Sequence, residues 1–219
     1  MDKPLTIHYY SDILCVWAWV AERRNQELLS QWENKIQFEH HYLDLFCDTQ
    51  KRIGEGWHKK GGFDGFAKHV EQSATPYTEA AIHADIWSKI RPSTSANAHL
   101  AIKAASIVSN SKTAESFALA LRQAFFVHAL DIGQLEVIYE VAEDNALNKT
   151  EIRECIRNGQ AIAALFSDNK LALQQRIQGS PSWIMNNGRQ LLYGNVGYRV
   201  LQANVEELLK NPQQEASWC

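Results

Sequence analysis

Strand-forming residues are confined to the two ends of this sequence, and the long middle of the chain has the pattern of helices. Residues 5–10 are rich in β-branched and aromatic side chains, and residues 36–43 alternate between apolar and polar positions, as strands do. Between them, residues 16–32 repeat apolar side chains at helical spacing. We therefore predict a βαβ unit at the start of the chain, with two parallel strands joined by a right-handed crossover.

The segment from residue 66 to residue 177 has helical spacing and no strand signal. Polar residues that favour helix starts, and a glycine that favours a helix stop, divide it into four expected helices. They begin at Thr94 or Ser95, at Thr113, at Leu135 and at Thr150, and the last one ends before Gly179.

Strand signals return after the helical segment. Residues 183–185 and 190–193 flank the turn Asn186-Asn187-Gly188, and an amphipathic helix follows over residues 198–209. A βαβ unit completed by an antiparallel hairpin and a closing helix is a thioredoxin-like core. We therefore predict an α/β fold with a large all-helical insertion.

The predicted thioredoxin-like domain comprises residues 1–48 and 178–212, and residues 213–219 form a flexible tail. Residues 49–177 would form a flap loop followed by the helical insertion domain. The flap is expected because residues 48–65 are polar and rich in glycine, and long loops in compact domains are usually functional.

Cys15 lies at the junction between the first predicted strand and the first predicted helix. Unpaired backbone N–H groups and the helix dipole stabilise an anion there, so we expect a thiol pKa below the ordinary value of about 8.5. Most free cysteines are small buried apolar residues, but this position favours a reactive one. Cys15 is therefore our candidate catalytic nucleophile.

The position that would carry a second thiol in a C-x-x-C motif is occupied by Ala18. Cys15 therefore cannot resolve its own mixed disulfide, and efficient dithiol oxidation is not expected. Cys47 follows the second parallel strand, at the sheet edge where the loop of Cys15 also lies, so it is a candidate resolving thiol. A simply buried cysteine beside Phe46 is the alternative.

Composition excludes several classes of function. The net charge is -3 and the basic residues are scattered, which does not favour nucleic acid as a partner. No stretch approaches the roughly 20 apolar residues that span a bilayer, and no secretory signal precedes the first strand. We therefore expect a cytoplasmic protein without a membrane partner. The eight histidines form no ligand pair on a helix face, so no metal site is expected.

Three segments resemble the DsbA-like group of thioredoxin-fold proteins, which includes FrnE-type oxidoreductases, kappa-class glutathione transferases and 2-hydroxychromene-2-carboxylate isomerases. They are Ser11-Asp12 with Cys15-Val16-Trp17-Ala18, the stretch from Pro92 to Leu100 with Phe125-Phe126 and Asp131-Ile132, and Gly179-Ser180-Pro181-Ser182. The segments occur in the order of that family and cover nearly the whole chain. The resemblance is specific for the fold but not for the reaction, because this chain has C-x-x-A in place of C-x-x-C.

The resemblance implies further site residues. In thioredoxin-like proteins the proline matching Pro181 is cis and faces the reactive cysteine, so the backbone of Ser180 would hydrogen-bond an extended thiol substrate. An ordinary strand-entry proline is the alternative. Trp17 is a candidate for stacking on a ligand beside Cys15. Asn97 would either point from the helical domain toward the cleft or cap a helix.

Three functions remain open at this stage. The favoured one is a thiol-disulfide oxidoreductase of the DsbA family that exchanges thiols with glutathione or another thiol substrate and has no tightly bound cofactor. The first alternative is a glutathione-dependent isomerase or transferase, in which the insertion supplies a pocket for a hydrophobic co-substrate. The second is a non-catalytic binding protein or chaperone. Because the family often dimerises, a homodimer is a further candidate.

Overall fold

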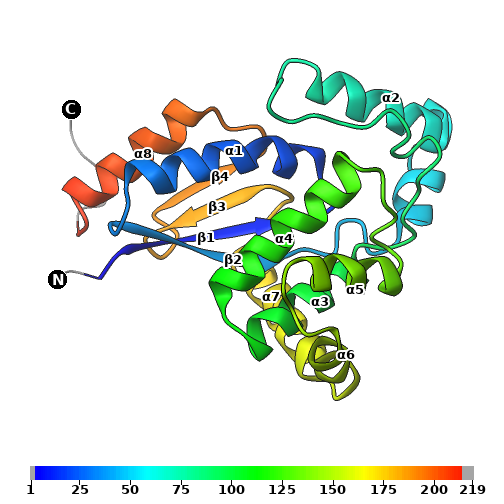
Figure 1. Ribbon diagram of the computed structural model, residues 1–219. Helices are drawn as coiled ribbons and strands as arrows, with labels where there is room; N and C mark the ends of the chain where they lie inside the picture. The colour runs from blue at the N-terminus through cyan, green and yellow to red at the C-terminus, as the bar shows by residue number, and fades with distance from the viewer. Residues whose placement is uncertain (1–2, 214–219) are drawn as a thin grey trace.

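One four-stranded sheet forms the centre of the protein in a computed structural model that describes residues 3–213 (Figure 1). Two strands, β1 and β2, run parallel and are joined by α1, whereas β3 pairs antiparallel with β1 and with β4. The predicted βαβ unit and hairpin are therefore confirmed, and α8 closes the second half. The elements are β1 (Leu5–Ser11), α1 (Val16–Gln31), β2 (Ile36–Tyr42), β3 (Ser182–Met185), β4 (Gln190–Tyr193) and α8 (Tyr198–Lys210), and the sheet order is β2-β1-β3-β4.

Helices from different parts of the chain cover the two faces of the sheet. Ile7 and Tyr9 of β1 are fully buried on one face, where they pack with residues of α1 and α8. Tyr10 lies on the opposite face and packs with Ala172 of α7 (Gln160–Gln174). Because side chains alternate along a strand, burial on both faces explains why β1 carries a nearly continuous run of apolar and aromatic residues.

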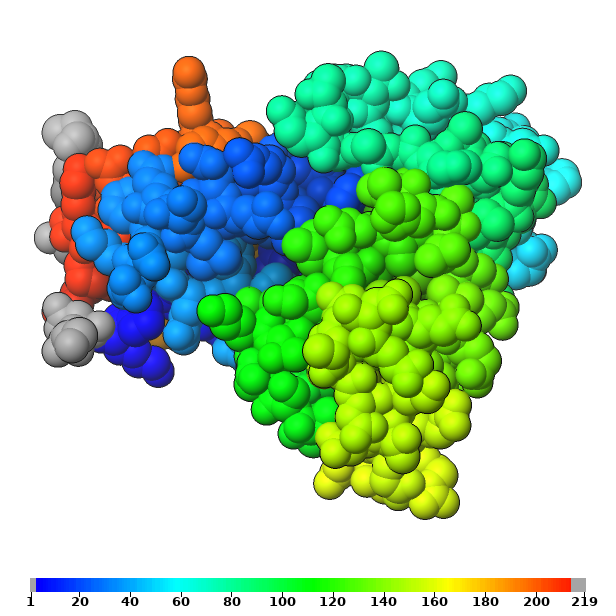
Figure 2. Space-filling model, in the orientation of Figure 1, coloured from blue at the N-terminus to red at the C-terminus, as the bar shows by residue number. Residues whose placement is uncertain are grey.

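The chain between β2 and β3 is mostly helical. Its remaining long helices are α2 (Gly62–Ala74), α3 (Ala96–Val108), α4 (Ser111–Phe126), α5 (Leu135–Asp144) and α6 (Lys149–Arg157). Figure 2 shows these helices, coloured cyan to yellow, beside the blue and orange part that contains the strands and α1. Within residues 3–213, no helix combines the length and the apolar character that a membrane span requires.

Residues 48–65, which the sequence predicts to be a flap loop, are folded instead. A π-helical turn, η1 (Gln50–Glu55), and a 3-10 turn, η2 (His58–Lys60), precede α2. Ile53 is fully buried and anchors η1 in the core of the insertion. Gly61 has a φ of 93°, a left-handed conformation that favours glycine, and it connects η2 to α2. The glycines of this segment therefore belong to compact turns and to the start of α2.

The helix predicted from Thr150 to Gly179 is two helices. α6 and α7 are separated by Gly159, whose φ of 87° places it in the left-handed region and ends the first helix. The second helix ends early, before Arg176, which also has a positive φ of 54°. Hydrophobic periodicity continues through both breaks, so it did not reveal them.

Candidate active site

Cys15 occupies the N-cap position of α1, in the helix-start location that the sequence predicts. Its N–H donates to the Asp12 carbonyl at 3.1 Å, which closes the turn after β1. Its backbone is extended, and its carbonyl accepts a helical hydrogen bond from the N–H of Trp19 at 3.0 Å. Cys15 is 5% exposed, so substrate access requires a small rearrangement around the sulfur.

The fully buried carboxylate of Asp12 holds this turn in place. Oδ1 accepts a hydrogen bond from the N–H of Leu14 at 2.9 Å, and Oδ2 accepts one from the N–H of Phe46 at 2.8 Å. The hydroxyl of Ser95, at the N-cap of α3, also donates to Oδ2 at 2.8 Å. Buried polar groups of this kind are stable when their hydrogen bonds are satisfied. Asp12 thus ties together the cysteine turn, the segment after β2 and the start of α3.

A buried guanidinium from the insertion holds the same turn from the other side. Arg122 of α4 donates to the carbonyls of Asp12 and Ile13, each at 3.3 Å, and to the hydroxyl of Ser11 at 3.0 Å. His99 of α3 is fully buried, and its Nε2 accepts a hydrogen bond from the N–H of Ile13 at 3.1 Å. Asp12, Arg122 and His99 were not predicted as site residues, because no local sequence pattern indicates that these distant side chains meet.

The segment Ser180–Pro181 lies against Cys15, and the peptide bond between these two residues is cis. The thiol of Cys15 donates to the carbonyl of Ser180, with a sulfur–oxygen distance of 3.4 Å. The hydroxyl of Ser180 accepts a hydrogen bond from the N–H of Asp12 at 3.0 Å. The structure therefore brings together Cys15 and the Ser180–Pro181 segment, as the sequence predicts.

Burial raises the pKa of the Cys15 thiol above its ordinary value, contrary to the lowered pKa predicted from the helix position. Hydrogen bonding from the Ser180 side chain and from the backbone of Ala18, together with the charge of Arg122, acts to lower the pKa, but burial and the Asp12 carboxylate outweigh these effects. In this state Cys15 is a protonated donor to the Ser180 carbonyl. Its ionisation requires that the sulfur gain contact with water or with a further hydrogen-bond donor.

The position of the missing second thiol, Ala18, lies close to Cys15 along the chain, at the start of α1. Ala18 lies in the first turn of α1 after Cys15 and is fully buried. Cys155 is buried in α6. Cys219 lies outside the described residues, as do the last six residues of the predicted tail.

Cys47 and Asn97 are engaged in other contacts. Cys47 is half-buried, its sulfur lies 3.7 Å from the hydroxyl oxygen of Ser95, and burial raises its pKa to about 11. Asn97 is the second residue of α3, so it is not the helix cap, and its amide donates to the carbonyl of Gly133 at 2.8 Å. The side chain of Asn97 thus serves a contact within the insertion.

The two tryptophans after Cys15 have different environments. Trp19 is buried, stacks on Phe126 with ring centroids 5.6 Å apart, and donates its indole N–H to the carbonyl of Ala81. Trp17 is only partly buried and meets Tyr77 edge to face, with centroids 6.3 Å apart. Trp19 is therefore the core member of the pair, and Trp17 keeps partial exposure close to the cysteine turn.

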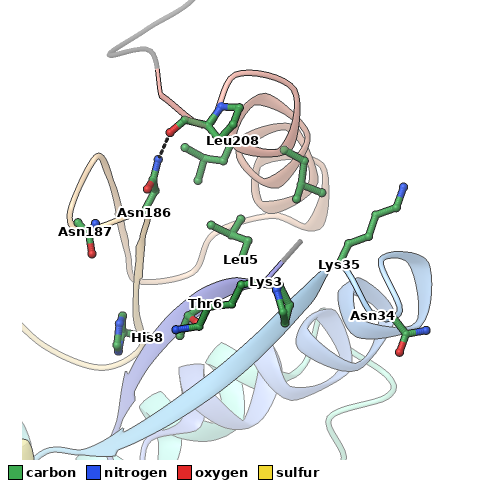
Figure 3. A pocket seen from close by; sticks show the side chains of 12 residues that line it. Lys3, Leu5, Thr6, His8, Asn34, Lys35, Asn186, Asn187 and Leu208 are labelled. Carbon is green, nitrogen blue, oxygen red and sulfur yellow. Dashed lines mark hydrogen bonds between the residues drawn. The ribbon is translucent and has the colours of Figure 1, made fainter. Parts of the chain in front are cut away.

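A cavity of about 850 Å³ lies at the other end of the sheet (Figure 3). Leu5 at the start of β1, Lys35 before β2 and Asn186 in the turn between β3 and β4 line it. Asn186 also donates to the carbonyl of Pro212 at 2.9 Å. Because Cys15 follows the opposite end of β1, this cavity is separate from the cysteine site.

Comparisons with known proteins find the same fold in several solved structures. A cytosolic disulfide reductase, DsbM from Pseudomonas aeruginosa, is 17% identical with a TM-score of 0.69, covering 92% of this chain and 99% of that one. A 2-hydroxychromene-2-carboxylate isomerase is 11% identical with a TM-score of 0.65, covering 97% and 100% respectively. BdbD from Bacillus subtilis is 11% identical with a TM-score of 0.62, covering 95% and 89%. These proteins share the fold, and the family model for the DSBA-like thioredoxin domain matches residues 6–206. The chain belongs to the DSBA-like thioredoxin domain family, as the resemblance of its three segments predicts.

Proposed function

We propose that the protein is a thiol-disulfide oxidoreductase in which Cys15 alone exchanges disulfides with glutathione or another thiol substrate. The observation that carries the proposal is the contact of the Cys15 sulfur with the Ser180 carbonyl, 3.4 Å away, at the N-cap of a helix. Helix-start N–H groups stabilise a thiolate once the sulfur ionises. With Ala18 in place of a second thiol, the chemistry is limited to mixed disulfides with an external thiol.

The proposed reaction removes glutathione from a protein or small-molecule mixed disulfide. The Cys15 thiolate attacks the glutathione sulfur, a new disulfide forms between Cys15 and glutathione, and the substrate leaves as a thiolate that takes up a proton. A second glutathione thiolate then attacks this disulfide, which releases oxidised glutathione and regenerates Cys15. Two glutathione molecules supply the two sulfurs of the product, so no resolving cysteine is needed.

The backbone at Ser180 is the proposed binding edge for the substrate. An extended peptide such as glutathione would pair its main chain with this segment in the manner of an added strand. Its arrival would displace the hydrogen bond that the Cys15 thiol now makes to the Ser180 carbonyl. The partly exposed ring of Trp17 would line the same approach.

Relatives support glutathione and a cytosolic location for the proposed reaction. DsbM is named as a cytosolic disulfide reductase, and a second structure of DsbM was obtained with GSH. That structure has a TM-score of 0.67 to this chain at 17% identity. A cytosolic setting suits the proposal, because the reaction consumes reduced glutathione and thiols there are kept reduced.

The test is glutathionylation and turnover in matched cysteine variants. After incubation with oxidised glutathione, intact-mass and peptide mass spectrometry should show one adduct on Cys15, and Cys15→Ser should lose both the adduct and turnover of a glutathione mixed disulfide. Cys47→Ser serves as the control and should retain both if Cys47 has no resolving role. An adduct found only on other cysteines would contradict the proposal. Unchanged turnover in Cys15→Ser would do so as well.

A second function is favoured by the protonated state of Cys15. A neutral thiol that donates to a carbonyl can equally donate to a bound glutathione thiolate, which is the arrangement that an isomerase or transferase of this fold requires. In that case Cys15→Ser should keep glutathione binding and activity toward a hydrophobic co-substrate. Turnover of a glutathione mixed disulfide by wild type and Cys15→Ser distinguishes the two functions, because the oxidoreductase reaction needs the Cys15 sulfur to form a covalent adduct, whereas calorimetric titration of reduced glutathione measures non-covalent binding only. If Cys15→Ala changed neither binding nor turnover, a non-catalytic role would be supported.

A further inference from the structure

Two histidines and a glutamate meet on one face of the sheet, far along β1 from Cys15. The sequence predicts no metal site, because no two histidines share a helix face, but strand pairing brings these together. His8 of β1 is in register with Glu39 of β2, and His41 lies two residues further along β2 on the same face. The distance from His8 Nδ1 to His41 Nε2 is 3.0 Å, and the Glu39 carboxylate oxygens lie 3.6 Å from His8 and 3.7 Å from His41.

The buried side chain of His41 is oriented by a carboxylate behind it. His41 Nδ1 lies 3.0 Å from Oδ1 of Asp168 in α7. The other carboxylate oxygen of Asp168, Oδ2, forms an ion pair with Lys103 at 2.6 Å. The second oxygen of Asp168 accepts the N–H of Tyr42 at 2.8 Å. Because an ionised carboxylate only accepts hydrogen bonds, Nδ1 of His41 carries the proton. Its Nε2 therefore directs a lone pair toward His8 and Glu39.

This arrangement has the two layers that a metal site needs. Histidines that bind metals usually donate their other ring N–H to a carboxylate, which fixes the ring and the tautomer. Two nitrogen ligands of a tetrahedral Zn²⁺ ion lie about 3.3 Å apart, since each Zn–N bond is about 2.0–2.1 Å long. The observed separation of 3.0 Å is close to this value. The distances from Glu39 to both rings are compatible with a third ligand after a small side-chain movement.

The cluster is open on one side. The side chain of His8 is 34% exposed and that of Glu39 is 56% exposed, whereas His41 is buried. His8 also lines the cavity shown in Figure 3, so an ion from solvent can reach its ring. We propose that His8, Glu39 and His41 bind one divalent transition-metal ion, with Zn²⁺ as the expected ion and water at the open position.

Metal binding at this place would replace an interaction that already exists. In the arrangement described, His8 donates the proton on Nδ1 to His41 Nε2, and the two rings stack with centroids 5.3 Å apart. The ion would take the place of that proton, which would be released to solvent. Because the three ligands come from both parallel strands and Asp168 comes from α7, the ion would also link these elements.

The test is a titration of Zn²⁺ into chelator-treated full-length protein whose accessible thiols have been alkylated. We expect one ion per chain, and an affinity at least about 10-fold lower in His8→Gln and in Glu39→Gln, since even an outer partner contributes about 10–100-fold. His58→Gln is the matched control, because His58 is exposed and lies in η2, and it should bind as the wild type does. Asp168→Asn tests the carboxylate that orients His41, and it should weaken Zn²⁺ binding while one site per chain remains.

Co²⁺ provides a spectroscopic readout in unalkylated protein. Ligation by two histidines and a carboxylate should give visible d–d bands without a thiolate charge-transfer band. Those bands should be lost in His8→Gln, whose substitution lies at a partly exposed position and leaves the core intact. Equal Zn²⁺ affinity in His8→Gln, Glu39→Gln and wild type would overturn the proposal. So would the absence of a stoichiometric site, or a Co²⁺ spectrum dominated by thiolate. These outcomes are independent of the reaction proposed for Cys15.

Discussion

The thiol of Cys15 and the carbonyl of Ser180 are hydrogen-bonded to each other although 165 positions separate them in the sequence. The first half of the thioredoxin-like unit supplies the sulfur and the second half supplies the carbonyl. Between them in the chain lies the insertion, and Arg122 of that insertion bonds the backbone carbonyls of Asp12 and Ile13. The conformation of the cysteine turn therefore depends on all three parts, so that folding of the insertion and formation of the site are coupled.

Asp12→Asn should destabilise the protein strongly. The Asp12 carboxylate is fully buried and accepts three hydrogen bonds. In asparagine, an NH₂ group replaces one of the two oxygens, so at least one of the three donors would face another donor and lose its hydrogen bond. We expect the free energy of unfolding to fall by about 3 kcal/mol, the upper range for hydrogen bonds to a charged group. Urea denaturation measures this loss, and faster alkylation of Cys15 should accompany it because the turn loosens.

The matched control for that substitution is Asp64→Asn. Asp64 is exposed and forms an ion pair with Arg91 at 2.6 Å, which should contribute less than about 1 kcal/mol. If both variants lost the same small amount of stability, the Asp12 carboxylate would not hold the turn as described.

Gly159→Ala should cost about 1 kcal/mol or slightly more. The φ of Gly159 is 87°, and no atom lies within 4 Å of the position that a Cβ would take, so backbone strain is the main cost of the change. Gly159→Asn should cost less, because asparagine tolerates the left-handed region better than alanine does. Thermal unfolding should show that Gly159→Asn is more stable than Gly159→Ala. Equal stability in both would show that the break between α6 and α7 does not depend on this conformation.

Local patterns predict part of the site well. Cys15 follows a strand and starts a helix, and Pro181 precedes a strand, so their neighbouring residues are sufficient to place each one on its element. That they face each other follows from the order of elements in the fold, which the resemblance supplied. The raised pKa of Cys15 was not predicted, because it depends on how deeply the sulfur is buried.

Contacts between distant segments could not be predicted from these patterns. Arg122 has the spacing of an ordinary helix residue, and only the packing of α4 against the cysteine turn shows that its charge is buried there. His8 and His41 were read as isolated histidines, because their proximity depends on the register between β1 and β2. A strand prediction gives the alternation of faces, but it does not give the register.

Stability should decrease as the solution becomes alkaline. Burial raises the pKa of both Cys15 and Cys47, the latter to about 11, so the folded protein binds these two protons more tightly than the unfolded chain does. Their contribution is complete below the ordinary thiol pKa of about 8.5 and is lost progressively as the pH rises toward the folded values. Urea denaturation between about pH 8.5 and pH 9.5 should show the decrease, below the ordinary pKa of about 10 for tyrosine and about 10.4 for lysine.

Cys47→Ser separates the two thiols in that measurement. Removal of Cys47 should reduce the slope of stability against pH, and the remaining slope should come from Cys15 together with Cys155, whose pKa burial also raises. An unchanged slope in Cys47→Ser, or a wild-type stability that rises with pH over this window, would contradict the raised pKa values.

Ala18→Cys should convert the exchange site into a dithiol site. Ala18 lies in the first turn of α1 and is fully buried, so the added sulfur should cost about 1 kcal/mol or slightly more through overpacking. In return, the new thiol can attack a mixed disulfide on Cys15 and release the substrate without glutathione. The variant should therefore catalyse insulin reduction by dithiothreitol, which wild type should do poorly. Ala21→Cys adds a thiol at an equally buried position one turn further along α1 and should bring no such gain. A folded Ala18→Cys protein that forms no internal disulfide and reduces no insulin would show that more than the missing thiol limits this site.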